Sequence, residues 1–183
     1  MNLVEIVNAT RTTIDEALVA RLVARVLEEE GVAGAEVAVS FVGERRIRAL
    51  NREHRGADEV TDVLSFPLED WEPGGGPAGG VTPGAAATPL ALAPDLGDVA
   101  AALEGAEGPP LLLGDVVVCV RRALRQARGD DLPPALELAV LLVHGTLHLL
   151  GYDHETDAGR MALRQAEALE LVDWRGLVVA PSR

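Results

Sequence analysis

Hydrophobic residues recur along this chain with two different periods, and these periods predict strands that alternate with helices. Leu3–Asn8 is predicted as a short first strand, and Val37, Val39 and Phe41 alternate with polar or small residues, as in a half-buried strand. Between them, an apolar residue recurs at every fourth position, at Ile14, Leu18, Leu22 and Val26. This spacing predicts an amphipathic helix up to Gly31, with Thr13 as its N-cap and Glu16 completing a capping box.

The same alternation continues in the middle of the chain. Glu44–Glu53 is predicted as a short helix, and Asp62–Phe66 as a strand that Pro67 closes. Gly114–Val120 is apolar and rich in β-branched residues, which predicts a fully buried strand. Arg121–Arg128 then returns to a helical pattern.

The longest apolar stretch, Pro134–Leu150, predicts one mostly buried helix with Pro at its first position. A last helix is predicted from a cap at Thr156 or Asp157 to about Val172. Together these elements indicate an α+β fold in a single domain spanning residues 1–183. We expect a small mixed sheet of about four strands, packed by helices, with the apolar helix at its centre.

Two segments fall outside this pattern. Residues from about 70 to 110 are rich in Gly, Pro and Ala, a composition that cannot bury a core of its own. They are predicted to form a flexible insertion without chemical function, with room for a brief helix near Asp98–Glu104. The residues from Arg175 to Arg183 are predicted to form a tail.

Charge narrows the classes of function. The net charge is −13, which argues against generic nucleic-acid binding, because phosphates are contacted mainly by cations. All sixteen basic residues are arginines, the side chain suited to bidentate phosphate contact. Nine of them form two clusters: Arg45, Arg46, Arg48, Arg52 and Arg55, then Arg121, Arg122, Arg125 and Arg128. Most of these are expected on solvated helix faces, as is the acidic run Glu28–Glu30.

The sequence also bears on the cellular compartment. The single cysteine, Cys119, cannot form an intramolecular disulfide, which fits a reducing cytosol. The first residues lack the basic and then apolar build of a signal peptide. No stretch reaches the roughly 20 uninterrupted apolar residues that a membrane span needs. We therefore expect a cytoplasmic protein without a membrane partner.

A histidine motif carries the most specific chemistry. Residues 144–154 read H-G-T-L-H-L-L-G-Y-D-H. On a helix, His144 and His148 lie one turn apart on the same face, with roughly 5–6 Å between their Cβ atoms. Gly151 tolerates a positive φ and can end the helix, so that the following turn can present His154 as a third ligand. Three neutral imidazoles suit Zn²⁺ best and leave a position for a water molecule.

Simpler interpretations of these residues exist. A single histidine in an apolar helix is more often a core residue, but three at this spacing favour a metal site with one Zn²⁺ per chain. The order H-G-x-L-H gives a zincin-like central helix, yet Gly145 stands where a zincin peptidase has its catalytic Glu. Asp153 and, on the same helix face as His144, Glu137 are candidate partners for the histidine N–H groups, although Glu137 could equally be a surface residue.

Two further segments accompany the histidine motif. Leu50–Pro67 reads L-N-R-E-H-R-G-A-D-E-V-T-D-V-L-S-F-P, and Leu113–Val118 reads L-G-D-V-V-V. Together with the motif, they resemble the signature segments of the YbeY family of bacterial endoribonucleases. The resemblance covers nearly the whole chain except for about 70–110, where that family has a short loop. His54 stands where the family usually has Tyr, and Val60 where it often has Pro.

The resemblance implies a single-strand-specific, metal-dependent endoribonuclease that acts in rRNA processing, chiefly small-subunit 3′-end maturation, and in ribosome quality control. His144, His148 and His154 would hold the metal. Arg55 matches an arginine of the family's active-site cleft that is important for RNA cleavage, and it would stabilise charge on the phosphate. Without the resemblance, a loop arginine paired with Asp58 or Asp62 is the simpler interpretation.

The implied partners are single-stranded RNA or rRNA and the small ribosomal subunit or one of its proteins, with the Era-type GTPase as a candidate. Two other functions stay open at this stage. The chain could be a non-catalytic ribosome-assembly factor whose metal is structural. It could also be a zinc metallopeptidase, against which the glycine at position 145 argues.

Overall fold

The structure, a computed structural model, describes residues 1–68, 111–154 and 157–179. The predicted insertion at about 70–110, its brief helix near Asp98–Glu104 and the candidate cap Thr156 lie outside the described residues. The elements in chain order are β1 (Leu3–Asn8), β2 (Thr13–Ile14), α1 (Glu16–Glu29), β3 (Ala35–Val42), α2 (Glu44–Arg55), β4 (Val63–Pro67), β5 (Leu111–Cys119), α4 (Val120–Gly129), α5 (Pro134–Leu149), α6 (Arg160–Leu171) and β6 (Val178–Val179).

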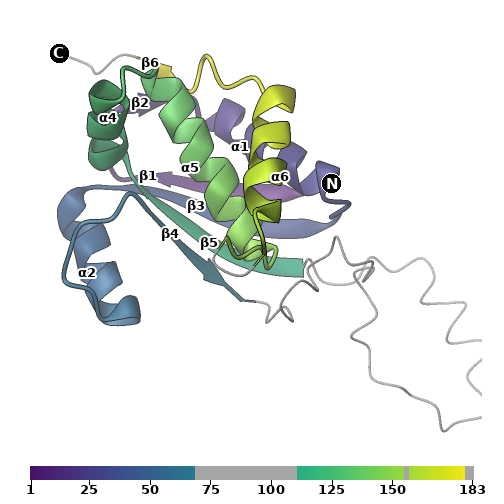
Figure 1. Cartoon of the computed structure of the whole chain (residues 1–183), viewed down its shortest axis with the longest axis horizontal. Helices are drawn as coiled ribbons and strands as arrows, with labels where there is room; N and C mark the ends of the chain where they lie inside the picture. Colours follow the sequence, from purple (N-terminus) through teal and green to yellow (C-terminus); the bar gives the residue numbers. More distant parts are fainter. Residues whose placement is uncertain (69–110, 155–156, 180–183) are drawn as a thin grey trace, which may run out of the picture.

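The main sheet has four strands in the order β1-β3-β5-β4 (Figure 1). Strands β1, β3 and β5 run parallel, and β4 pairs with β5 in the antiparallel direction. Helices α1 and α5 pack on one face of this sheet, with α4 and α6 on either side of α5. The predicted α+β fold with a mixed four-stranded sheet and a central apolar helix is therefore confirmed.

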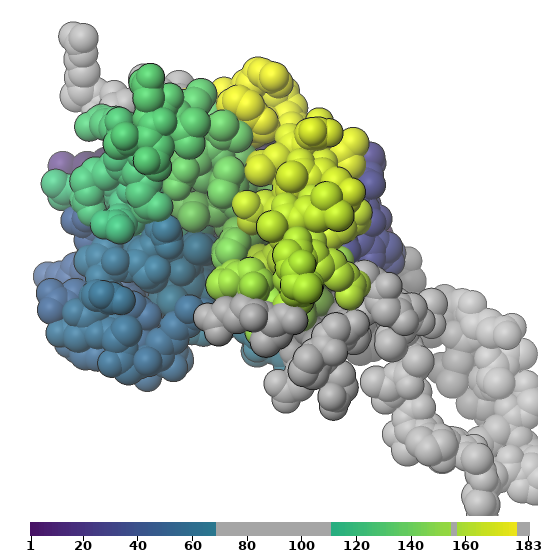
Figure 2. All heavy atoms as spheres, viewed as in Figure 1, coloured from purple at the N-terminus to yellow at the C-terminus, as the bar shows by residue number. Residues whose placement is uncertain are grey.

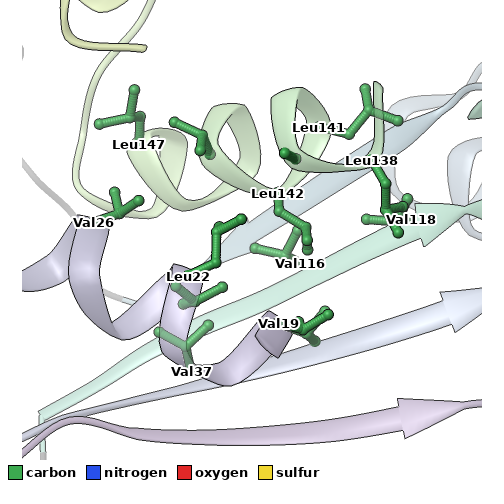
Figure 3. Packing of buried hydrophobic residues seen from close by; sticks show 14 of the residues in the cluster. Val19, Leu22, Val26, Val37, Val116, Val118, Leu138, Leu141, Leu142 and Leu147 are labelled. Atoms are coloured by element: carbon green, nitrogen blue, oxygen red, sulfur yellow. The ribbon is translucent and has the colours of Figure 1, made fainter. Parts of the chain in front are cut away.

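Helix α5 is apolar almost all round because it is surrounded. Figure 3 shows Leu142 pointing toward Val116 of β5 and Leu22 of α1. Leu138 lies beside Val118, and Leu147 lies near the α1 end that carries Val26. All of these side chains are at most 2% exposed. A helix that is apolar on every side is typical of a core position, which is where α5 lies.

The opposite face of the sheet carries α2. Ile47 of α2 is fully buried and packs with Leu64 of β4 and Val117 of β5 in a second, smaller cluster. In the space-filling view, α2 and α4 lie next to one another on one side of the molecule (Figure 2). The sheet thus lies between α2 and the helices α1 and α5, while α2 meets α4 at the side of the molecule. None of the helices in the described residues combines the length and hydrophobicity that a membrane span requires.

Strand β5 begins earlier than the sequence predicts. Its pairing with β3 starts at Leu111, three residues before Gly114. The strand contains a register irregularity opposite Glu36 and Val37, and Gly114 sits there with a φ of +131°. Glycine inside a strand therefore marks a β-bulge in this chain rather than the strand's beginning.

The predicted cap of the first helix and the predicted tail are both wrong. The N-cap of α1 is Asp15, whose side chain accepts a hydrogen bond from the Leu18 amide at 2.9 Å. Thr13 instead belongs to β2, which pairs with β6 in a two-stranded antiparallel sheet, so residues 178–179 are not a tail. Strands of two residues are too short to produce a periodic signal in the sequence.

The last helix begins slightly later than expected. Helix α6 starts at Arg160, and its N-cap residue is Gly159. The predicted cap, Asp157, lies two residues further upstream, yet its carboxylate accepts hydrogen bonds from the amides of Met161 at 2.7 Å and Gly159 at 3.0 Å. Asp157 therefore does bind a free amide of the first turn, from outside the helix.

The bulge at Gly114 generates a stability prediction. A Cβ atom there would lie 2.1 Å from the carbonyl oxygen of Phe66, and the backbone is in a region that side chains rarely adopt. We expect Gly114→Ala to lower the free energy of unfolding by about 3 kcal/mol or more, measured by urea denaturation. The matched control is Gly129→Ala, because a Cβ at Gly129 would meet nothing within 4 Å. Equal losses in both variants would contradict the role of the bulge.

Candidate metal centre

The end of α5 determines where the histidines lie. The helix ends at Leu149, and Gly151 follows with a φ of +81°, as the sequence predicts. The amide of Gly151 donates to the His148 carbonyl and that of Tyr152 to the Leu147 carbonyl, both at 3.1 Å. These bonds turn the chain back toward the helix. The reversal carries His154 to the same side as the histidines of α5.

The three predicted histidines form one cluster. Their ring centroids are 4.6 Å apart for His144 and His148, 5.5 Å for His144 and His154, and 5.3 Å for His148 and His154. One nitrogen from each ring lies within 4.8 Å of the other two, an arrangement that could hold a metal ion. His144 and His148 are half-buried, whereas His154 is exposed. Among the residues that the structure describes, no other such group of His, Cys, Asp or Glu is present.

Hydrogen bonds determine which ring nitrogens face the centre of the cluster. The Nδ1 atom of His144 lies 3.1 Å from Oε1 of Gln165, and that of His148 lies 2.9 Å from the Tyr152 carbonyl oxygen. Because both partners are acceptors, each Nδ1 is assigned the proton. The two Nε2 atoms then present lone pairs to one another at 3.1 Å. Two facing lone pairs repel unless a cation lies between or beside them, so the donor set fits a metal ion.

The surroundings favour the neutral form of these rings. Burial lowers the pKa of His144 and of His148. The neighbouring histidines lower both values further, and the positive charge of Arg55 adds to the effect on His148. Neutral imidazole is the form that binds a metal. The protein therefore presents these two side chains as ligands near neutral pH.

A buried ion pair anchors the turn that contains Tyr152. The Tyr152 hydroxyl donates to Oε2 of Glu30 at 2.6 Å. Arg164 donates to Oε1 of Glu30 from Nε at 2.8 Å and from Nη2 at 2.6 Å. The side chain of Glu30 is only 4% exposed, so the expectation that it is solvated is wrong. Its charge is compensated by three hydrogen bonds, as a buried carboxylate requires.

Position 145 faces the sheet and not the histidine cluster. A Cβ atom on Gly145 would lie 2.6 Å from Cγ1 of Val116 and 3.2 Å from Oγ of Ser65. The Ser65 hydroxyl donates to the Gly145 carbonyl at 3.1 Å, so side chains of the sheet lie directly against the backbone of α5. A glutamate cannot occupy this position without moving α5. The packing at position 145 thus excludes the catalytic glutamate on which a zincin peptidase depends.

Arg55 is the last residue of α2 and is exposed. Its charge acts on His148, as described above, so the two side chains are within electrostatic reach of each other. Within the described residues, Arg55 forms no ion pair. Asp58 pairs instead with Arg48 and Arg52, which means that the simpler interpretation of Arg55 as a partner of Asp58 does not hold.

The two acidic candidates differ in position. Glu137 is buried two turns from the cluster, where its Oε1 accepts a hydrogen bond of 3.4 Å from Gln126. Burial, followed by the charge of Asp62, raises the pKa of Glu137. No hydrogen bond joins Glu137 to a histidine in the described chain. Asp153 lies directly before His154 and is half-buried, and its carbonyl accepts a hydrogen bond from the Asp157 amide at 3.0 Å.

Gln165 is the residue that sequence reasoning missed. It lies in α6, 21 residues after His144, and its amide oxygen is the partner of His144 Nδ1. A glutamine in an amphipathic helix carries no signal of such a role. Only the packing of α6 against α5 brings the two side chains together.

Comparison with known proteins decides the family. The sequence profile described as Endoribonuclease YbeY matches residues 5–173. The chain belongs to the YbeY family. This confirms the resemblance that the histidine motif and the segment Leu50–Pro67 indicate.

Individual relatives agree with this membership. An Endoribonuclease YbeY from Anaeromyxobacter sp. (strain Fw109-5) is 43% identical over 155 residues, which cover 84% of this chain and 61% of the relative. Another from Macrococcus caseolyticus is 41% identical over 152 residues, covering 81% of this chain and 80% of the relative. The chain thus spans less than two thirds of the first relative and about four fifths of the second.

A solved structure supports the YbeY-type fold. The solution structure of a Thermotoga maritima protein matches with a TM-score of 0.53 and 25% sequence identity. The match covers 92% of this chain and 87% of the other. The arrangement of sheet and helices described above is therefore shared with an experimentally determined structure.

The anchor on Tyr152 predicts an effect on metal affinity. Tyr152→Phe removes the hydroxyl that Glu30 holds, and with it the restraint on the carbonyl that orients His148. We expect zinc affinity to fall roughly 10-fold, measured by competition with a chromophoric chelator. The control is Thr146→Val, which removes a buried hydroxyl in α5 that is bonded only to the Leu142 carbonyl. An equal fall in the control would point to general loosening of the helix.

The lowered histidine pKa values predict a pH dependence. The imidazoles of His144 and His148 bind protons less readily in the folded protein than in the unfolded chain. The free energy of unfolding of the metal-free protein is therefore undiminished above pH 6.5, the unperturbed pKa of histidine. Stability is lost as the pH falls from there through the lowered folded pKa. Zinc affinity should fall over the same range, since protons compete with the metal. Equilibrium dialysis at several pH values measures this, and full metal retention at pH 5 would contradict the site.

Proposed function

We propose that this chain is a single-strand-specific, metal-dependent endoribonuclease. Two findings support the proposal: membership of the YbeY family, and relatives named Endoribonuclease YbeY that align with most of the chain. The observation that carries it is the convergence of three imidazoles on one point, with two Nε2 atoms only 3.1 Å apart. A hydrolase that needs a bound metal ion has its ligands ready in this arrangement.

The proposed ligands are His144, His148 and His154, and the proposed metal is one Zn²⁺ per chain. Nitrogen ligands suit zinc, and three of them leave a coordination position free for water. A zinc ion held there would supply a water molecule that ionises near neutral pH and a positive charge for a phosphoryl oxygen. Gln165 and the Tyr152 carbonyl keep two of the rings oriented through their Nδ1–H groups.

Arg55 is proposed to bind the reacting phosphate. Hydrolysis of a phosphodiester builds negative charge on the phosphorane, and a guanidinium can stabilise that charge with two parallel hydrogen bonds. Arg55 is exposed, is without an ion pair among the described residues and lies within electrostatic reach of His148. It is therefore free to bind a substrate anion beside the histidines.

The metallopeptidase alternative is not favoured. It requires a general base at position 145, where the chain has a glycine packed against Val116. The alternative of a non-catalytic assembly factor requires only that the metal be structural. Its distinguishing feature is that Arg55 would then be dispensable.

In the cell, we propose a role in rRNA processing in the cytoplasm, chiefly maturation of the small-subunit rRNA 3′ end, and in ribosome quality control. The substrate would be single-stranded rRNA, and the partners would be the small ribosomal subunit or one of its proteins, with the Era-type GTPase as a candidate. The net charge of −13 supports dependence on such a partner, because an acidic protein binds arbitrary RNA weakly.

Cleavage of an unstructured RNA tests the proposal directly. We expect Arg55→Ala to cleave about 10²–10³ times more slowly than the wild type while retaining its metal, because one charge-stabilising group is lost. His148→Ala should lose both metal and cleavage. Gel-based cleavage rates and the metal content of each preparation are the measurements.

Arg21→Ala is the matched control, since Arg21 is an exposed arginine of α1. It should cleave at the wild-type rate. Equal cleavage by all four proteins would indicate a contaminating nuclease and would favour the assembly-factor function. Loss of metal from Arg55→Ala would mean that this arginine supports the site structurally.

A further inference from the structure

One face of α2 carries a row of arginines. Their spacing of three, four and three residues places them within about 80° of each other around the helix axis. The members are Arg45, Arg48, Arg52 and Arg55, and all four are exposed. On the adjoining side of the helix, Ile47 and Asn51 are buried against the rest of the fold. We call these four residues the α2 arginine face. Such a concentration of positive charge is unusual in a chain whose net charge is −13.

The α2 arginine face leads to the candidate metal centre. Its last member, Arg55, follows His54, whose ring lies 4.9 Å from that of Phe66 in β4. The neighbouring Ser65 donates to the carbonyl of Gly145, the residue after His144, at 3.1 Å. At the other end of α2, Glu44 forms ion pairs with Arg121 and Arg125 of α4. The rise of an α-helix puts Arg45 and Arg55 about 15 Å apart along the axis. A linear anion bound along this face would therefore run to the end of α2 at which Arg55 lies.

Two of the arginines are already arranged to bind an anion. Arg48 donates from Nε and Nη2 to the two oxygens of Asp58, at 3.0 and 2.8 Å. Arg52 approaches the same carboxylate with Nη1 at 3.5 Å. This two-pronged geometry is the one with which guanidinium groups bind phosphate. Because all three side chains are about half exposed or more, the pairs contribute little to stability and can be exchanged for another anion.

An aromatic pair lies at the same end as Arg55. The ring of His54 contacts the ring of Phe66 edge-on, with 4.9 Å between centroids and an interplanar angle of 63°. His54 is exposed, and Phe66 is half-buried. Proteins that bind single-stranded nucleic acid combine a positive track for the backbone with rings on which bases stack. Only a single strand offers unstacked bases to such a ring.

We propose that the α2 arginine face binds the backbone of single-stranded RNA beside the candidate metal centre, with Asp58 as an anionic placeholder that RNA phosphate displaces. In this proposal, His54 stacks on a base next to the phosphate that Arg55 holds. The inference rests on the proposed function, since it names the surface that delivers the substrate. Binding of RNA phosphates would account for a row of arginines on one short helix of an acidic protein.

The test measures binding separately from cleavage. Fluorescence anisotropy of a labelled unstructured RNA oligonucleotide, with EDTA present to prevent cleavage, gives the affinity as a function of salt. Each phosphate contact adds about 0.7 to the slope of log K against log salt for a single strand. Arg45→Ala should reduce this slope by about 0.7. The control, Arg21→Ala, removes the same charge from α1 and should leave the slope unchanged.

Two more variants test the placeholder and the stacking. Asp58→Asn should tighten RNA binding several-fold, because Arg48 and Arg52 no longer have a competing carboxylate. A weaker affinity in Asp58→Asn with an unchanged thermal unfolding midpoint would overturn the placeholder role. His54→Ala should weaken binding to single-stranded RNA and leave binding to a duplex unchanged. Equal effects on both substrates would overturn the stacking role.

The outcomes separate this inference from the proposed function. Cleavage of the same oligonucleotide with zinc restored is measured in parallel. A wild type that cleaves, together with an unchanged salt slope in Arg45→Ala, overturns the inference and leaves the endoribonuclease intact. A wild type that binds through α2 without cleaving overturns the proposed function and leaves the surface intact. A wild type that neither binds nor cleaves overturns both.

Discussion

The close approach of α5 to the sheet is the constraint on which the rest of the structure depends. At Gly145 the helix backbone comes so near to Val116 and Ser65 that no side chain fits between them. This contact sets the rotation of α5 about its own axis. The rotation in turn determines that His144 and His148 are only half-buried while their neighbours in α5 are fully buried. The glycine that separates this chain from zincin peptidases is therefore also what positions its histidines.

Much of this architecture could be predicted from the sequence because it follows from the spacing of residues within single helices, strands and turns. The helix of residues 134–149, its end at Gly151 and the return of His154 each follow from spacing within a few residues. The parallel sheet follows from apolar runs separated by helices. These features need no knowledge of which segments meet in space.

The features that sequence reasoning missed are those that arise from contacts between distant segments. Gln165 meets His144 only because α6 packs on α5, and Glu30 is buried only because Arg164 and Tyr152 reach it from more than 120 residues away. An acidic run at the end of a helix looks solvated until its partners are known. In the same way, Gly114 looks like the start of a strand until the bulge is seen.

The two histidines of α5 differ in the kind of atom that orients them. His144 is held by a side-chain amide, which a single substitution can delete, whereas His148 is held by a main-chain carbonyl, which no substitution at position 152 can remove. The two halves of one cluster thus differ in their exposure to mutation. A single substitution at Gln165 deletes the hydrogen-bond partner of His144, whereas a substitution at Tyr152 can loosen the partner of His148 but cannot delete it.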